Sequence, residues 1–249
     1  MAMAELEQLF KDTLHEDDCA AFLIEPVLGE GGYVPAPPDF LGRVQEFANS
    51  KRALLICDEV QTGFGRTGSF FACDSERYAD ERGRVQPDIL TMAKGIASGF
   101  PLSAVATWRE VADACDPGML GGTYAANALS CAAAVATQRV IRDEGLVENS
   151  NLMGERLREN LRNIQGNISS RGLIGDVRGL GLMTAVEFTR DAEPGIKTKL
   201  SKECIEDDLL ILGCSTYEVI RFVPPLNITE EDIDTACERF EKALKRVIE

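Results

Sequence analysis

The sequence has almost no histidine and little positive charge. Its 249 residues include 1 histidine, and 26 lysines and arginines stand against 41 aspartates and glutamates, which gives a formal net charge of −15. Binding to nucleic acid or to an anionic membrane requires a basic face, so this charge balance argues against both partners. No run approaches the roughly 18 to 20 apolar residues of a membrane span. We therefore expect a globular protein that acts on small molecules.

Paired cysteines are also missing. None of the 8 cysteines forms a C-x-x-C pair, and His15 is the only imidazole, so we expect no metal site of the zinc type. Cys57, Cys131 and Cys204 stand in apolar or helical runs, where a reduced cysteine acts as a small hydrophobic residue. This usage predicts a reducing compartment, the cytoplasm. A mitochondrial location would follow if an N-terminal segment is missing.

The hydrophobic pattern predicts an α/β protein with a mostly parallel sheet and helices on both faces, because its apolar runs are continuous rather than alternating. The strands are expected at residues 20–24, 54–60, 89–93 and 103–108, and the helices at 5–14, 39–47 and 127–141. After residue 144 the pattern changes to an α+β layout. It has charged helices at 147–161 and 231–247 and short strands at 182–187, 209–212 and 219–222. We expect a larger domain over residues 1–146 and a smaller one over 147–249.

Charged side chains stand at or near the ends of the predicted strands. Glu25, Asp58 and Lys94 hold these positions, and ligands of parallel sheets gather beyond such ends. Asp58 and Val60 share one face, whereas Glu59 points to the other. A carboxylate beside a branched apolar side chain could hold a protonated heterocycle, as pyridoxal phosphate chemistry requires. Taken singly, Asp58 also suits a turn cap and Lys94 a solvated surface position.

The segment from Gly63 to Gly68 matches the dinucleotide pattern G-x-G-x-x-G. That motif requires a helix that opens at the third glycine and an acidic residue at the end of the following strand. Residues 69–72 carry no helix signals, and Asp88 precedes its strand instead of ending it. We therefore interpret the glycines as a structural turn.

Several segments in a fixed order carry a more specific signature. They are GEGG at 29–32, DEVQTGFGRTG at 58–68, PDIL at 87–90, AKG at 93–95, GGTY at 121–124, GDVRGLG at 175–181 and RFVPPL at 221–226. Together they resemble the class III aminotransferases, which are fold-type I pyridoxal-phosphate enzymes acting on ω-amino groups. The resemblance runs from about residue 20 to the end. It implies a fold-type I large domain, incomplete on its N-terminal side, and a C-terminal α+β small domain.

The resemblance implies that pyridoxal 5'-phosphate is the cofactor. Lys94 would form the internal aldimine, Asp58 would pair with the pyridine nitrogen, Gln61 would reach the ring hydroxyl and Val60 would pack on the ring. Thr123 would bind the phosphate of the cofactor in the neighbouring subunit. A homodimer with shared active sites is implied.

Two further residues would handle the substrates. By resemblance, Arg221 holds the α-carboxylate of the 2-oxo acid, and Glu30 pairs with Arg221 when a substrate without that carboxylate is bound. A bidentate guanidinium suits a carboxylate, and a movable glutamate could switch its availability.

The sequence is most similar to 4-aminobutyrate aminotransferases. They transfer an ω-amino group to 2-oxoglutarate, giving a semialdehyde and glutamate. Ornithine and acetylornithine aminotransferases are alternatives. Family members begin well upstream of Met1, so a truncated, catalytically incomplete remnant is a further alternative to a working enzyme. Residues 73–87 look longer than usual for the family and are expected to form a surface insertion.

Overall fold

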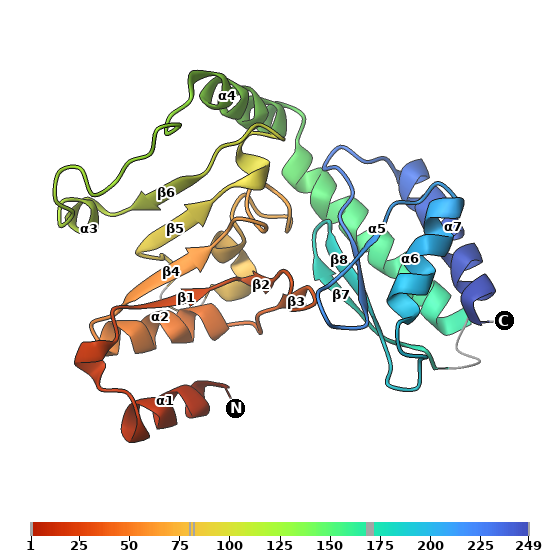
Figure 1. Ribbon diagram of the computed structural model, residues 1–249, viewed down its shortest axis with the longest axis horizontal. Coiled ribbons are helices and arrows are strands. Elements are labelled where there is room, and N and C mark those ends of the chain that lie inside the picture. Colours follow the sequence, from red (N-terminus) through yellow and green to blue (C-terminus); the bar gives the residue numbers. More distant parts are fainter. Residues whose placement is uncertain (1, 80, 82, 168–171, 249) are drawn as a thin grey trace. The chain divides into compact units, whose positions relative to one another are not determined.

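The computed structural model describes residues 2–79, 81, 83–167 and 172–248 (Figure 1). These residues form two compact units. Unit 1 contains the described residues of 1–26, 36–64 and 71–139, and unit 2 contains those of 27–35, 65–70 and 140–249. The sequence suggested a single boundary near residue 146. In the structure, two short early segments, residues 27–35 and 65–70, also pack with the C-terminal residues in unit 2.

Unit 1 is built on a four-stranded sheet with the strand order β1-β4-β5-β6. β1 and β5 each pair with β4 in parallel, and β6 pairs with β5 antiparallel, so the prediction of a mostly parallel sheet is confirmed. The elements are α1 (Ala2–Asp12), η1 (Glu16–Asp18), β1 (Ala21–Ile24), α2 (Phe40–Ser50), β4 (Leu54–Asp58), η2 (Ala72–Asp74), η3 (Glu76–Tyr78), β5 (Ile89–Met92), η4 (Lys94–Ile96), β6 (Ala104–Thr107), α3 (Arg109–Ala112) and α4 (Ala128–Asp143), whose last residues belong to unit 2.

The two faces of this sheet differ in burial. Leu55 and Cys57 of β4 are fully buried in the core of unit 1, and helix α2 packs against β1 and β4. Ile56 and Asp58 alternate with them and are only partly buried. Leu23 of β1, which pairs with Ile56, is 67% exposed. Asp58 therefore lies on the more open face of the sheet.

The expectation that residues 73–87 lie on the surface is wrong for Cys73, Tyr78 and Val85, which are buried in the core of unit 1. Tyr78 and Cys73 are buried, and the Tyr78 hydroxyl donates a hydrogen bond of 2.9 Å to the carbonyl oxygen of Pro26. Arg77 donates to the carbonyl of Ala36 at 3.2 and 3.3 Å. Burial raises the pKa of Tyr78 to about 12. The prediction rested on the length of this segment, which does not show that Cys73 and Tyr78 pack in the core of unit 1.

Replacing Tyr78 with phenylalanine is expected to lower the free energy of unfolding by about 1 kcal/mol, because one buried hydrogen bond is lost. The Pro26 oxygen would keep its bond from the Ala36 N–H, which limits the loss. Urea denaturation measures the change. The matched control is Tyr124→Phe, whose side chain is 86% exposed and whose replacement should be neutral. Equal effects of the two substitutions would contradict the role of the Tyr78 bond.

Unit 2 is an α+β unit, as predicted. Its antiparallel sheet has the order β7-β8-β10-β9, and a separate two-stranded hairpin pairs β2 with β3. The elements are β2 (Val27–Leu28), β3 (Val34–Pro35), α5 (Leu146–Asn167), β7 (Ile174–Leu180), β8 (Met183–Phe188), α6 (Ile196–Glu206), β9 (Leu212–Gly213), β10 (Val219–Phe222) and α7 (Glu230–Ile248). Helix α6, strand β7 and the β2–β3 hairpin were not predicted.

Alternation along the strands gives unit 2 two apolar layers. Val186 and Phe188 of β8 pack in the core that α5, α6 and α7 cover, whereas Met183 and Ala185 face the opposite side. Tyr33 of the hairpin, which is 1% exposed, packs in this second layer. The early segment 27–35 therefore belongs to unit 2. Among the described helices, none is both long and apolar enough to cross a membrane.

Candidate active site

The carboxyl ends of the parallel strands lie at the same edge of the unit 1 sheet, as expected for Asp58 and Lys94. β4 ends at Asp58 and the neighbouring β5 ends at Met92, two residues before Lys94. Oδ1 of Asp58 accepts hydrogen bonds from the Val60 N–H at 3.0 Å and from the Thr91 hydroxyl at 3.2 Å. Thr91 is the register partner of Asp58 on β5. These two bonds fix the carboxylate at the strand end.

Lys94 has an unusual backbone conformation. Its φ is +45°, in the left-handed region, where a residue with a side chain is strained by roughly 1–3 kcal/mol. Such strain persists mainly at functional sites. A Cβ on the next residue, Gly95, would lie 3.3 Å from the Cβ of Phe64, so the chain packs closely here. The Lys94 side chain itself is exposed within the described residues of this chain.

Glu59, on the other side of the strand from Asp58, is a positioning residue that sequence reasoning missed. Its side chain is fully buried. One carboxylate oxygen accepts from the Cys73 N–H at 2.7 Å and the other from the Thr62 hydroxyl. Its carbonyl also accepts from the Gly63 N–H at 3.0 Å. Glu59 thus fixes the turn that follows Asp58. The available signal was the alternation that points Glu59 toward the core.

Gln61 and Thr123 occupy different environments within unit 1. Oε1 of Gln61 is buried and has no hydrogen-bond partner among the described residues. A buried acceptor without a donor is costly unless a ligand or water satisfies it, so Gln61 fits a cofactor hydroxyl. Asp58 and Gln61 thus provide two hydrogen-bond acceptors, and Val60 an apolar side chain, which suit a protonated pyridine ring that carries a hydroxyl. Thr123 is exposed. No hydrogen bond or ion pair joins Thr123 or Lys94 to these residues within the described chain.

The glycine motif forms turns, and no helix opens at Gly68. Gly65 has a φ of +90° and Gly68 a φ of +82°, which glycine adopts readily. A Cβ on Gly68 would lie 1.8 Å from Oδ1 of Asn151, so a larger residue does not fit. Between these glycines, Arg66 donates to the carbonyl of Pro224 at 2.6 Å. The motif therefore serves close packing in unit 2, in line with the interpretation as a structural turn.

Glu30 and Arg221 meet in unit 2, as the resemblance implied. Arg221 lies on β10, and its Nη1 atom is 2.5 Å from Oε1 of Glu30. The guanidinium carbon lies 5.9 Å from the centre of the Tyr33 ring. Burial works against the charge of Arg221, but Glu30 and Tyr33 outweigh it, so the pKa of Arg221 lies above its ordinary value. Nε of Arg221 is buried and lacks a hydrogen-bond acceptor within the described residues.

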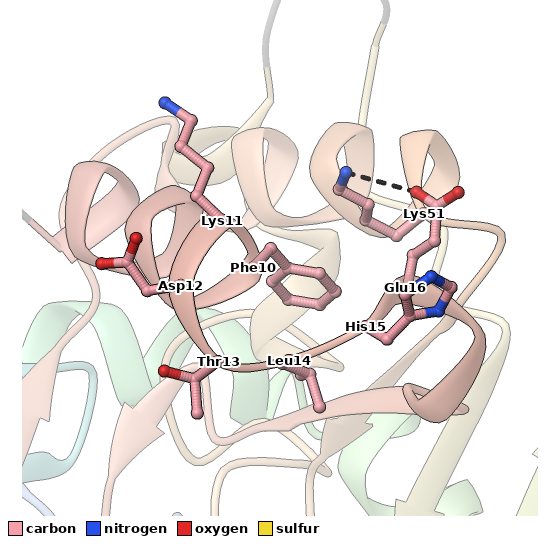
Figure 2. A pocket seen from close by; sticks show the side chains of 8 residues that line it. All are labelled: Phe10, Lys11, Asp12, Thr13, Leu14, His15, Glu16 and Lys51. Atoms are coloured by element: carbon pink, nitrogen blue, oxygen red, sulfur yellow. Dashed lines mark hydrogen bonds and ion pairs between the residues drawn. The ribbon is translucent and has the colours of Figure 1, made fainter.

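A hollow of about 390 Å³ lies elsewhere in unit 1, between α1, η1 and the end of α2 (Figure 2). Lys51 lies 3.4 Å from Glu16 and faces the Phe10 ring at 5.5 Å. The hollow contains none of the predicted site residues, and of its two lysines, Lys11 and Lys51, the second is paired with Glu16. It is an open surface feature rather than a site with catalytic groups.

Comparison with known proteins gives consistent matches along the whole chain. A family model described as aminotransferase class-III matches residues 1–244. The 5-aminovalerate aminotransferase DavT of Pseudomonas aeruginosa is 41% identical over 239 residues, covering 94% of this chain and 54% of that protein. The 4-aminobutyrate aminotransferase GabT of Escherichia coli is 39% identical, covering 95% of this chain and 55% of that protein.

Solved structures agree in fold. An ornithine aminotransferase from Toxoplasma gondii, with pyridoxal phosphate at partial occupancy in its active site, superposes with a TM-score of 0.86 at 36% identity. The match covers 98% of this chain and 54% of that one. An aminotransferase from Bacillus anthracis gives a TM-score of 0.87 at 32% identity. The chain spans about half the length of the curated relatives that it matches.

Proposed function

Because the chain belongs to the class III aminotransferases, we propose that it transfers the amino group of an ω-amino acid, 4-aminobutyrate first, to 2-oxoglutarate. The observation that carries this proposal is the pairing of Glu30 with Arg221. The products are a semialdehyde and glutamate. The similarity to 4-aminobutyrate and 5-aminovalerate aminotransferases supports a donor whose amino group stands far from its carboxylate.

The Glu30–Arg221 pair suits an enzyme that takes two kinds of substrate in turn. The carbon that carries the ω-amino group bears no carboxylate, so the partly buried cationic side chain of Arg221 needs another anion, and Glu30 supplies it. A 2-oxo acid brings an α-carboxylate that can bind the guanidinium through two hydrogen bonds. Glu30 is 63% exposed at its side chain and can move toward water, whereas Arg221 is 16% exposed and stays in place.

The residues at the edge of the unit 1 sheet would hold the cofactor. Pyridoxal phosphate, when bound, supplies an electron sink for the bonds of the amino-bearing carbon. Asp58 would hold a proton on the ring nitrogen, Val60 would give the ring an apolar surface and Gln61 would accept a hydrogen bond from the ring hydroxyl. Lys94 would anchor the group through its amine.

Lys94 would also move the proton of the reaction. Its Nζ atom, as a free amine, could take a proton from the amino-bearing carbon of the substrate and return it to a carbon of the cofactor. A short, exposed connection at the end of β5 gives this amine access to the ligand side of the sheet edge. The glycine beside it allows the Phe64 side chain to pack closely against this connection.

We further propose a homodimer in which Thr123 binds the cofactor phosphate of the neighbouring subunit. The support is that Thr123 is exposed within its own chain and that it stands in the segment Gly121-Gly122-Thr123-Tyr124. A hydroxyl and backbone N–H groups suit a phosphate. The chain spans about half the length of its relatives, so the transamination activity is proposed together with the homodimer.

A panel of amino donors tests the function. The protein, supplied with pyridoxal phosphate and 2-oxoglutarate, should form glutamate fastest with 4-aminobutyrate, and more slowly with 5-aminovalerate, ornithine and acetylornithine. Glutamate is measured with a coupled dehydrogenase. A preference for ornithine or acetylornithine would contradict the proposed donor, and no glutamate from any donor would contradict the proposed reaction.

A further inference from the structure

A second arginine lies on the same face of the unit 2 sheet as Arg221. Arg178 of β7 and Arg221 of β10 both pair with Ala185 of β8, the strand between them. Residues in register on adjacent strands point to the same face, and two strand spacings separate these arginines by roughly 10 Å. Ala185 packs in the layer that includes Tyr33 of the β2–β3 hairpin. Both arginines therefore face the hairpin that carries Glu30.

Arg178 is committed to neighbours within unit 2. Its Nε and Nη2 atoms donate to the carbonyl oxygen of Gly32 at 3.0 and 2.7 Å. Its Nη1 atom donates to Asp176 at 3.0 Å and to Glu187. The side chain is 13% exposed. With two carboxylates and a carbonyl already bound, Arg178 is not suited to capture a substrate carboxylate, and its partners indicate a structural hold on the hairpin turn.

The turn between β2 and β3 is shaped for this contact. Gly32 has a φ of +105°, a conformation that side chains resist. A Cβ at Gly32 would lie 3.2 Å from Nη2 of Arg178, so even a methyl group would crowd the guanidinium. The turn is held at two points, by Arg178 at Gly32 and by Arg221 at Glu30. The first contact is made to the backbone carbonyl of Gly32, and the second to the exposed side chain of Glu30, which can move away from Arg221.

We propose that Arg178 is the positioning residue that fixes the Glu30 turn and thereby sets how often Glu30 occupies Arg221. This inference rests on the proposed function, in which Glu30 and the α-carboxylate of the oxo acid compete for Arg221. Without Arg178, the Gly32 carbonyl loses two charge-assisted hydrogen bonds and Glu30 explores more conformations. Arg221 is then occupied by Glu30 for a smaller fraction of the time.

Hydrogen exchange tests the hold on the turn without any need for activity. In Arg178→Met, the backbone amides of residues 27–35 should exchange about tenfold faster or more, because the turn opens more often. Arg178→Lys keeps the charge but not the paired donors, and should give an intermediate rate. The matched control is Arg158→Met, which removes a buried arginine that donates to the carbonyl of Gly181 at 2.7 Å. This control should leave exchange in 27–35 unchanged.

Steady-state kinetics test the consequence for Arg221. In Arg178→Met, the KM for 2-oxoglutarate should fall by about three- to tenfold, because Glu30 competes less with the substrate carboxylate for Arg221. The KM for 4-aminobutyrate should rise by about the same factor, because Glu30 neutralises the charge of Arg221 less often. A merely structural role would raise both KM values. Opposite shifts with faster exchange support the proposal, and any other pattern overturns it. If the wild-type protein transaminates no donor, the proposed function fails, and the exchange rate alone decides whether Arg178 holds the turn.

Discussion

Replacing Lys94 with alanine is expected to lower turnover by about 10⁴-fold or more, because the amine that anchors the cofactor and moves the proton is removed. Alanine would keep the backbone at its φ of +45°, so the connection after β5 should retain its shape. Since the Lys94 side chain is exposed, little packing is lost. Glutamate formation, followed under saturating cofactor and substrates, measures the effect.

The control for this result is Lys11→Ala, which removes another exposed lysine of unit 1. It should turn over like the wild type, and both variants should unfold at the wild-type urea concentration. Transamination by Lys94→Ala above about 1% of the wild-type rate would contradict the assigned role, since such an activity exceeds what binding and orientation alone provide.

Asp58→Asn is expected to reduce kcat/KM by about 10²- to 10³-fold, the range seen when one preorganised electrostatic contact is removed from an active site. This substitution removes the negative charge of residue 58 but should leave its side chain in the same place. Both hydrogen bonds to Asp58 fall on Oδ1, and an amide oxygen can accept them from Val60 and Thr91 in the same way. What disappears is the negative charge that would keep a ring nitrogen protonated.

The control for Asp58→Asn is a substitution at Glu59, the next residue along the chain. Glu59→Gln changes the buried carboxylate on the opposite side of the chain, whose partners are Cys73 and Thr62. It should affect the unfolding free energy more than kcat/KM, whereas Asp58→Asn should do the reverse. If Asp58→Asn instead loses stability and keeps its kcat/KM, Asp58 is a turn cap rather than a cofactor ligand.

The sequence by itself determined the architecture of the sheet edge. Continuous apolar runs that end in Asp58 and lead to Lys94 predicted parallel strands, and parallel strands bring such ends to one edge. The fixed order of the motifs identified the family, because so many spaced residue types rarely coincide. The resemblance to that family implied a role for Glu30 beside Arg221, which the order of the motifs does not show by itself. Local alternation also placed Asp58 and Glu59 on opposite sides.

Only the tertiary structure decided which distant residues meet. Glu30 and Arg221 are 191 residues apart, and their contact depends on how the β2–β3 hairpin packs on β8 and β10. The hold of Arg178 on Gly32 and the burial of Tyr78 are likewise long-range. Periodicity reports which face of an element is buried, but not which partner covers it. Strand register and packing supply that choice, and they are set by contacts across the whole unit.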